Sequence, residues 1–218
     1  MHVVKVYNDT EGIIVQVKKD GGAGFLRFLR ESFANTFIHL LSICTPLDFK
    51  WENSKLVVEA RINDALAKMV EEFDKPGRSA LLDTGSDKTA LDKVAWDAGL
   101  TIIYMYEVLR ESRGGKHQFR GLRIEAHKVG YYRTVYSNKA KLILELLKRH
   151  GVVVWAGFGL TLKAYVDSKL LETVIKLGEL RIRITRNILK ELMDAVDDLD
   201  RFCDVLTPYL LADEIKGG

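Results

Sequence analysis

The sequence predicts an α+β protein of two ββαββα-type halves, with mixed or antiparallel sheets, helices packed on one face and a C-terminal helix. Short β-rich runs occur in pairs joined by turn residues, helical patterns follow the pairs, and this order occurs twice. The expected divisions are a first half over residues 1–76, a second half over 79–180 and a C-terminal segment over 181–218.

The first half is expected to open as a hairpin, because NDTEG places Asn, Asp and Gly between two β-rich runs. Apolar residues then recur at helical spacing from Phe25 to Ile43, which predicts an amphipathic helix. In order, we expect strands 2–7 and 12–19, helix 25–43, strands 47–51 and 55–62, and a helix capped by Asn63 or Asp64.

The second half begins after KPGR at residues 75–78, the clearest structure breaker in the chain. It differs from the first half by an additional opening helix, capped by Ser86 and ended at Gly99. The elements expected after that helix are strands 101–108, 122–127 and 131–136, a helix 138–150 capped by Ser137 or Asn138, strands 152–155 and 160–166, and a helix from Asp167 or Ser168 to about Leu177.

The C-terminal segment is expected to hold a short basic strand, LRIRIT at 180–185, and a helix over 186–206. One face of that helix is acidic. We interpret this face as solvated surface rather than a metal site; it consists of Glu191, Asp194, Asp197, Asp198 and Asp200.

The two halves also match locally, because VVEARINDALAKMV (57–70) aligns with TLKAYVDSKLLETV (161–174). Both pieces place a capping residue between a strand and a helix. An internal duplication and an ordinary strand–cap–helix pattern both explain this match, and the sequence leaves the two open.

The composition bounds the function only broadly. A net charge of +3 and a pI near 8.7 permit an anionic partner, and isolated Cys44 and Cys203 indicate neither a zinc site nor a disulfide framework. We therefore expect no metal and no cofactor. No apolar run has the length of a membrane span, so we expect a cytoplasmic protein. The scarcity of Gln and Asn beside abundant Lys, Arg and Glu is typical of hyperthermophiles.

ALLDTGSDKT at residues 80–89 resembles the active-site segment of retroviral-type aspartic proteases. The resemblance implies that Asp83 is the catalytic acid and that a dimer mate supplies the second carboxylate. The residues on both sides have helical patterns, unlike the strands of that family. A capped helix start explains the segment without catalysis.

The order helix, two strands, helix, two strands, helix resembles the architecture of LAGLIDADG homing endonucleases. That resemblance implies double-stranded DNA as partner and places Asp97, in KVAWDAG, at the helix end where Mg²⁺ would be held against a phosphate. The first half has no corresponding helix, which implies a catalytically degenerate member. An additional strand between Gln118 and Tyr136 is a second departure. RGGKHQF and GYY also resemble a paralogous family of hyperthermophilic archaea without an assigned activity.

Binding without catalysis is the third expectation. Basic residues with interleaved aromatics on alternating strands suit contacts with phosphates and bases, although one solvated sheet face explains them equally. The residues predicted to bind nucleic acid are Lys5, Lys18, Arg61, Arg123, His127 and Lys163. We thus predict a DNA-binding protein of LAGLIDADG-like architecture, with an Asp83 protease and a non-catalytic structural or interaction protein as alternatives.

Overall fold

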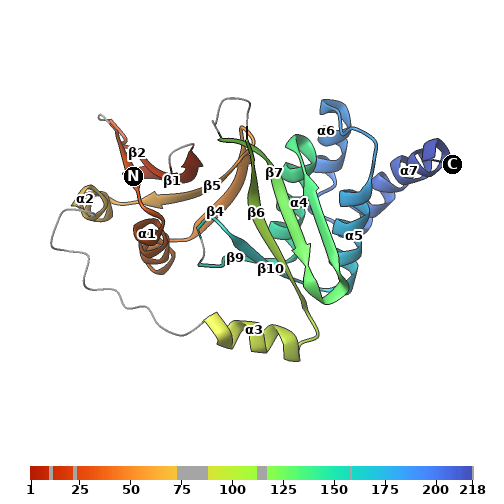
Figure 1. Ribbon diagram of the computed structural model, residues 1–218, viewed down its shortest axis with the longest axis horizontal. Coiled ribbons are helices and arrows are strands. Elements are labelled where there is room, and N and C mark those ends of the chain that lie inside the picture. The colour runs from red at the N-terminus through yellow and green to blue at the C-terminus, as the bar shows by residue number, and fades with distance from the viewer. Residues whose placement is uncertain (10–11, 22–23, 73–87, 112–116, 158, 218) are drawn as a thin grey trace.

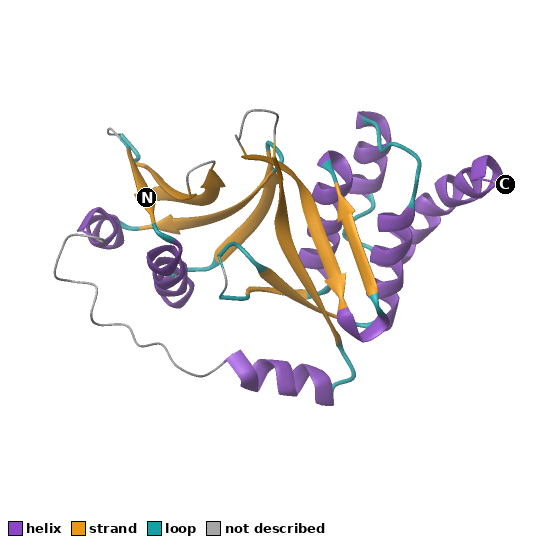
Figure 2. Ribbon diagram, in the orientation of Figure 1, coloured by secondary structure: helices purple, strands orange, loops and turns teal. Residues whose placement is uncertain are grey.

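The protein is described by a computed structural model, which covers residues 1–9, 12–21, 24–72, 88–111, 117–157 and 159–217 (Figure 1). KPGR, Asp83 and Ser86 lie outside the described residues. Within them the fold is α+β, with two antiparallel five-stranded sheets and a C-terminal helix (Figure 2), as the sequence predicts.

The first half forms sheet A, with strand order β3-β2-β1-β5-β4. Alternate residues of β1, such as Val4 and Val6, are buried beneath helix α1, which buries Phe37, Ile38 and Leu41. The elements are β1 (His2–Asp9), β2 (Gly12–Lys18), β3 (Phe25–Leu29), α1 (Glu31–Cys44), β4 (Leu47–Glu52), β5 (Lys55–Ile62) and α2 (Asp64–Glu72).

The second half forms sheet B, with strand order β8-β7-β6-β10-β9, and helix α3 (Lys88–Asp97) precedes it. In Figure 1 strands β7 and β8 lie in front of α4 and α5, so helices cover one face of this sheet. The elements are β6 (Thr101–Glu111), β7 (His117–Ala126), a 3-10 turn η1 (His127–Val129), β8 (Tyr131–Val135), α4 (Ser137–His150), β9 (Val152–Trp155), β10 (Leu162–Val166) and α5 (Ser168–Glu179).

The two halves have the same topology, since β1 to β5 correspond to β6 to β10 in both chain order and sheet order. Strand pairing makes the correspondence residue-specific. Lys5 pairs with Glu59 as Tyr104 pairs with Lys163, in agreement with the sequence match of 57–70 to 161–174. Helices α1 and α4 both have 14 residues and both begin two residues after the preceding strand.

The halves meet through matching contacts. Asn8 of β1 donates a side-chain hydrogen bond to Glu107 of β6, and these two positions correspond in the strand registers. Helix α4 contacts the other half at β4, where Lys148 lies 2.7 Å from Asp48. Helix α1 contacts the other half at β9, where the rings of His39 and Trp155 are 6.1 Å apart. Each half therefore packs its long helix against an edge strand of the other.

Two predicted elements were wrong. Residues 25–29 form strand β3 instead of the start of a helix, because they pair with β2 from Val17 opposite Phe25 to Ile13 opposite Leu29. A short apolar run fits both periods, and pairing decides between them. Strand β3 is also the counterpart of β8, so the additional strand of the second half is common to both. LRIRIT is not a strand, and its residues Leu180 and Ile184 are buried beside α4. The Lys139 ammonium donates to the carbonyl of Leu180, and the Asn138 amide donates to the carbonyl of Ile184.

The single C-terminal helix predicted over 186–206 is two helices, α6 (Arg186–Asp194) and α7 (Leu199–Gly217). Asp198 separates them, because its side chain accepts hydrogen bonds from the backbone N–H groups of Asp200 and Arg201 and so caps a new helix. None of the helices in the described part of the chain combines the length and apolar character needed to cross a membrane.

Helix caps were predicted with mixed success. Asn63 accepts a hydrogen bond from the backbone N–H of Leu66 at 2.9 Å, and Asp167 accepts one from Leu170 at 2.8 Å. These caps occupy corresponding positions in the two halves. Neither Ser137 nor Asn138 caps α4: the helix begins after Tyr136 without a side-chain cap, and the Asn138 amide donates to Ile184 instead.

Helix α5 packs closely on sheet B at Gly178. A Cβ at this position would lie 1.9 Å from the hydroxyl oxygen of Tyr131, which has no hydrogen-bond partner within the described residues. Burial raises the pKa of Tyr131 to about 12. In an unobstructed helix Gly→Ala stabilises by about 1 kcal/mol, but here the clash should make Gly178→Ala destabilising by about 1–3 kcal/mol.

The control is Tyr131→Phe, which removes the obstructing oxygen and should change stability little on its own. Urea unfolding should show a smaller cost of Gly178→Ala in the Tyr131→Phe background than in the native background. An equal cost in both backgrounds would contradict this packing.

Candidate nucleic-acid interface

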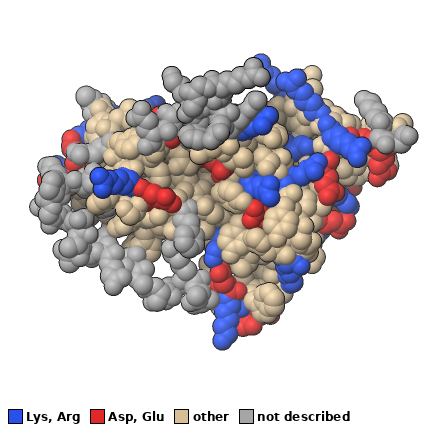
Figure 3. Space-filling model, viewed as in Figure 1, with Lys and Arg blue, Asp and Glu red and all other residues tan. Residues whose placement is uncertain are grey.

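The face of sheet B opposite the helices carries rings and charged side chains beside aliphatic residues such as Ile102 and Val154. Strand β6 alternates buried Ile103 and Met105 with half-buried Tyr104 and Tyr106, and the pairing of Tyr106 with Arg123 continues the same face on β7. Figure 3 views the molecule from the same side as Figure 1 and shows basic and acidic side chains interspersed over uncharged surface.

Five of these side chains form a continuous row across β10, β6, η1, β8 and β7, which we call the aromatic–basic row: Lys163, Tyr104, His127, Tyr132 and Arg123. The Lys163 ammonium lies 5.6 Å from the centre of the Tyr104 ring, and the Tyr104 and His127 rings are 5.6 Å apart. The rings of His127 and Tyr132 are 5.4 Å apart, and the Arg123 guanidinium lies 6.0 Å from the Tyr132 ring. Cations at these distances from ring faces are attracted by the ring quadrupole.

Glu125 holds one end of the row in place. Its carboxylate accepts a hydrogen bond from Tyr106, lies 3.3 Å from the Arg123 Nε and lies 3.3 Å from the His127 Nε2. Burial and the hydrogen bond to Glu125 raise the pKa of Tyr106, so its phenol stays protonated and donates. Two rings of the row remain accessible, because Tyr132 is 47% exposed and the His127 side chain is 56% exposed.

Lys163 has a partner from outside the sheet. Asp92 of α3 lies 2.8 Å from the Lys163 Nζ and accepts a hydrogen bond of 2.5 Å from the Tyr165 hydroxyl. Burial disfavours the charged form of Asp92, but the two donors outweigh burial and lower the pKa of its carboxyl. Burial and the bond to Asp92 raise the pKa of Tyr165.

The predicted residues of the first half lie on the open face of sheet A, where Lys5 is neutralised within the sheet. Its Nζ lies 2.8 Å from a carboxylate oxygen of Glu52 and 3.3 Å from one of Glu59. Glu59 also forms an ion pair with Lys50, whose Nζ lies 3.0 Å away. The hydrogen bonds to these carboxylates raise the pKa of Lys5 against the effect of burial. Lys5 is thus part of an ion-pair network that leaves little charge for an anionic partner.

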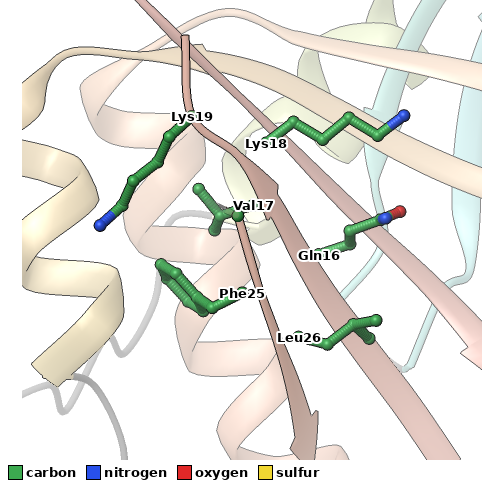
Figure 4. Close-up of a pocket in the computed structure, with 7 residues that line it drawn as sticks. Gln16, Val17, Lys18, Lys19, Phe25 and Leu26 are labelled. Atoms are coloured by element: carbon green, nitrogen blue, oxygen red, sulfur yellow. The ribbon is translucent and has the colours of Figure 1, made fainter. Parts of the chain in front are cut away.

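Lys18 and Arg61 are exposed on the same face as Lys5. Lys18 lines a hollow of about 500 Å³ between the ends of β2 and β3. In Figure 4 Lys18, Gln16 and Leu26 point to one side of the two strands, and Lys19 and Phe25 point to the other. The structure therefore brings together three of the six predicted residues, Arg123, His127 and Lys163, and places the other three on the second sheet.

Only one of the two candidate catalytic carboxylates lies within the described residues. Asp97 is the last residue of α3 and is exposed, whereas Asp83 lies outside the described residues. Within the described residues no group of three or more His, Cys, Asp or Glu side chains could hold a metal ion.

Comparison of the chain with protein-family models, with curated proteins and with solved structures gave no match.

A second chemically distinctive group, Glu107, lies where the halves meet. Besides the bond from Asn8, its carboxylate accepts one of 2.5 Å from the backbone N–H of Leu56. It borders a cleft of about 630 Å³ that is also lined by Glu31, Tyr106 and Thr161. Burial raises the pKa of Glu107 from 4.5 to about 7, against the opposing effect of these hydrogen bonds and of Lys55.

This shift predicts a pH-dependent stability. Between pH 4.5 and about 7 the folded state keeps the proton of Glu107 while the unfolded state has lost it, so the free energy of unfolding falls as the pH rises. The contribution corresponds to about 3 kcal/mol over this interval. Glu107→Gln removes the titrating group and should remove this part of the slope, making the variant relatively more stable at pH 8 than at pH 5.

Urea unfolding of both proteins across this pH range measures the difference directly. Glu59→Gln is a matched control, because Glu59 is also a half-buried sheet carboxylate, but against the effect of burial its bonds to Lys50 and Lys5 lower its pKa, so its loss should leave the slope between pH 4.5 and about 7 unchanged. Parallel pH profiles for the native chain and Glu107→Gln would show that Glu107 does not titrate in this range.

Proposed function

We propose that the protein binds nucleic acid on the open face of sheet B, and that the aromatic–basic row is the contact surface. One observation carries this proposal: three neighbouring rings lie between the cations Lys163 and Arg123, and two of these rings, His127 and Tyr132, are accessible. Bases stack on tyrosine and histidine rings, and arginine and lysine contact phosphates.

Single-stranded nucleic acid fits this surface better than a duplex. Stacking on ring faces needs bases that are not already stacked in a helix, and a row of rings along a sheet suits successive unpaired bases. The resemblance to LAGLIDADG endonucleases predicts double-stranded DNA, which would contact the sheet through phosphates and groove edges. A titration with a single strand and with its duplex separates these predictions.

Tyr132→Ala should weaken binding of a labelled single-stranded oligonucleotide of about 12 nucleotides by about tenfold, because a base–aromatic stack is worth about 1–3 kcal/mol. Tyr132→Phe keeps the ring and should bind within about twofold of the native chain. Fluorescence anisotropy at low and higher salt measures both affinities. Tyr209→Ala is the control, since Tyr209 lies on α7 and bonds Glu191 on α6.

Arg123→Ala should weaken binding and also lower the salt dependence, by about 0.7 in the slope of log affinity against log salt, because one phosphate contact is lost. No affinity for either form of nucleic acid at low salt would refute the proposal and leave the interaction-protein alternative. Tighter binding of the duplex, unaffected by Tyr132→Ala, would favour the duplex prediction instead.

A further inference from the structure

The carboxylate of Asp92 lies between two hydrogen-bond donors of sheet B, at a point that also suits an anion from another molecule. Its two carboxylate oxygens meet the Lys163 ammonium at 2.8 Å and the Tyr165 hydroxyl at 2.5 Å. Lys163 is largely buried, its side chain being 11% exposed. A cation and a hydroxyl that converge on one point form a site for an oxyanion, and phosphate oxygens accept the same hydrogen bonds as a carboxylate.

The first half shows how this sheet position is neutralised when no outside group takes part. Glu59 corresponds to Lys163 in the strand registers, and Glu59 pairs with Lys5 and Lys50 of its own sheet. In sheet B the same position is a lysine, and its carboxylate partner comes from α3. The described residues of the first half contain no counterpart of α3.

Helix α3 is held to the sheet by few contacts besides Asp92. Ala95 is buried, but Leu91, Val94 and Trp96 are 44%, 64% and 69% exposed. The Trp96 ring is approached by the ammonium of Lys128 in η1, which lies 5.3 Å from the ring centre. A helix of 10 residues is marginal without tertiary contacts. Figure 1 shows α3 at the margin of the fold, beyond the end of β6.

We propose that Lys163 and Tyr165 form a phosphate-binding site that the Asp92 carboxylate fills, so that α3 competes with nucleic acid for one end of the aromatic–basic row. This rests on the proposed function for its ligand, a phosphate group of the nucleic-acid backbone. Displacement of Asp92 frees two donors next to Tyr104, and a base stacked on that ring would have its phosphate within their reach.

The test removes the competing charge and keeps the shape of the side chain. Asp92→Asn should bind the single-stranded oligonucleotide about tenfold more tightly than the native chain, because the carboxylate no longer competes with phosphate for Lys163. Asp97→Asn is the matched control on the same helix, where Asp97 is exposed, and it should change the affinity far less. In a Lys163→Ala background Asp92→Asn should have no effect, since the two residues act through one contact.

A second measurement does not depend on nucleic acid. Inorganic phosphate should shift the NMR signals of the Tyr165 ring in Asp92→Asn at concentrations that leave the native protein unchanged. Phenol titration should also show a lower pKa of Tyr165 in Asp92→Asn, which confirms that the carboxylate contact exists in solution.

The outcomes separate the two proposals. If Tyr132→Ala weakens oligonucleotide binding but Asp92→Asn leaves it unchanged or weaker, the phosphate site is refuted and the proposed function stands. If phosphate perturbs Tyr165 in Asp92→Asn but no variant binds an oligonucleotide, the site is upheld and the proposed function is refuted. If phosphate perturbs neither protein, the site is refuted whatever the oligonucleotide does.

Discussion

Glu107 accepts hydrogen bonds from the side chain of Asn8 and from the backbone of Leu56, and these bonds join the two sheets. A buried carboxylate is costly unless donors satisfy it, so these bonds hold β6 against β1 and β5 in one arrangement. Because Asn8 and Glu107 are corresponding positions, this contact is of the kind that a twofold relation between equivalent units produces. The reciprocal packing of α4 on β4 and of α1 on β9 follows the same relation.

That relation makes the differences between the halves informative. Both sheets have an aliphatic face under their helices, but their open faces differ. Sheet A places cations and carboxylates side by side, as in the Lys5, Glu59 and Lys50 network, and so neutralises itself. Sheet B has Tyr104 and Lys163 where sheet A has Lys5 and Glu59, with Glu125 as a local anchor. A surface that only needed solvation could have kept the arrangement of sheet A.

Much of the fold could be predicted from the sequence because its signals are local. Turn residues between β-rich runs located four hairpin strands of sheet A, and Asn63 and Asp167 were recognisable as caps. Strand β3 and the segment 180–185 were missed for a shared reason: alternation and helical spacing describe which side chains are buried, but a strand exists only where a neighbour pairs with it. The correspondence of β3 with β8 depends on such pairing and therefore became visible only in three dimensions.

The aromatic–basic row was only partly predictable, because its members are brought together by strand register. Alternation along β7 and β10 identified Arg123 and Lys163 as members of a polar face. Tyr104 lies in the apolar and aromatic run IIYMY, and Tyr132 stands beside another tyrosine, so the face that each ring takes is set by register. Glu107 follows the buried positions Ile103 and Met105, a position at which a carboxylate has no local explanation and needs partners from the other half.

Helix α3 shows why long-range placement decides the role of a carboxylate. Asp97 drew attention from the sequence because it ends a helix, yet Asp92 is the residue that meets the sheet, three positions before the buried Ala95 and on the same side of the helix. The charge of Asp92 matters only because Lys163 stands where the other half has Glu59. Lys163 is largely buried and needs an anion as partner, and α3 supplies that anion in a form that a phosphate can replace.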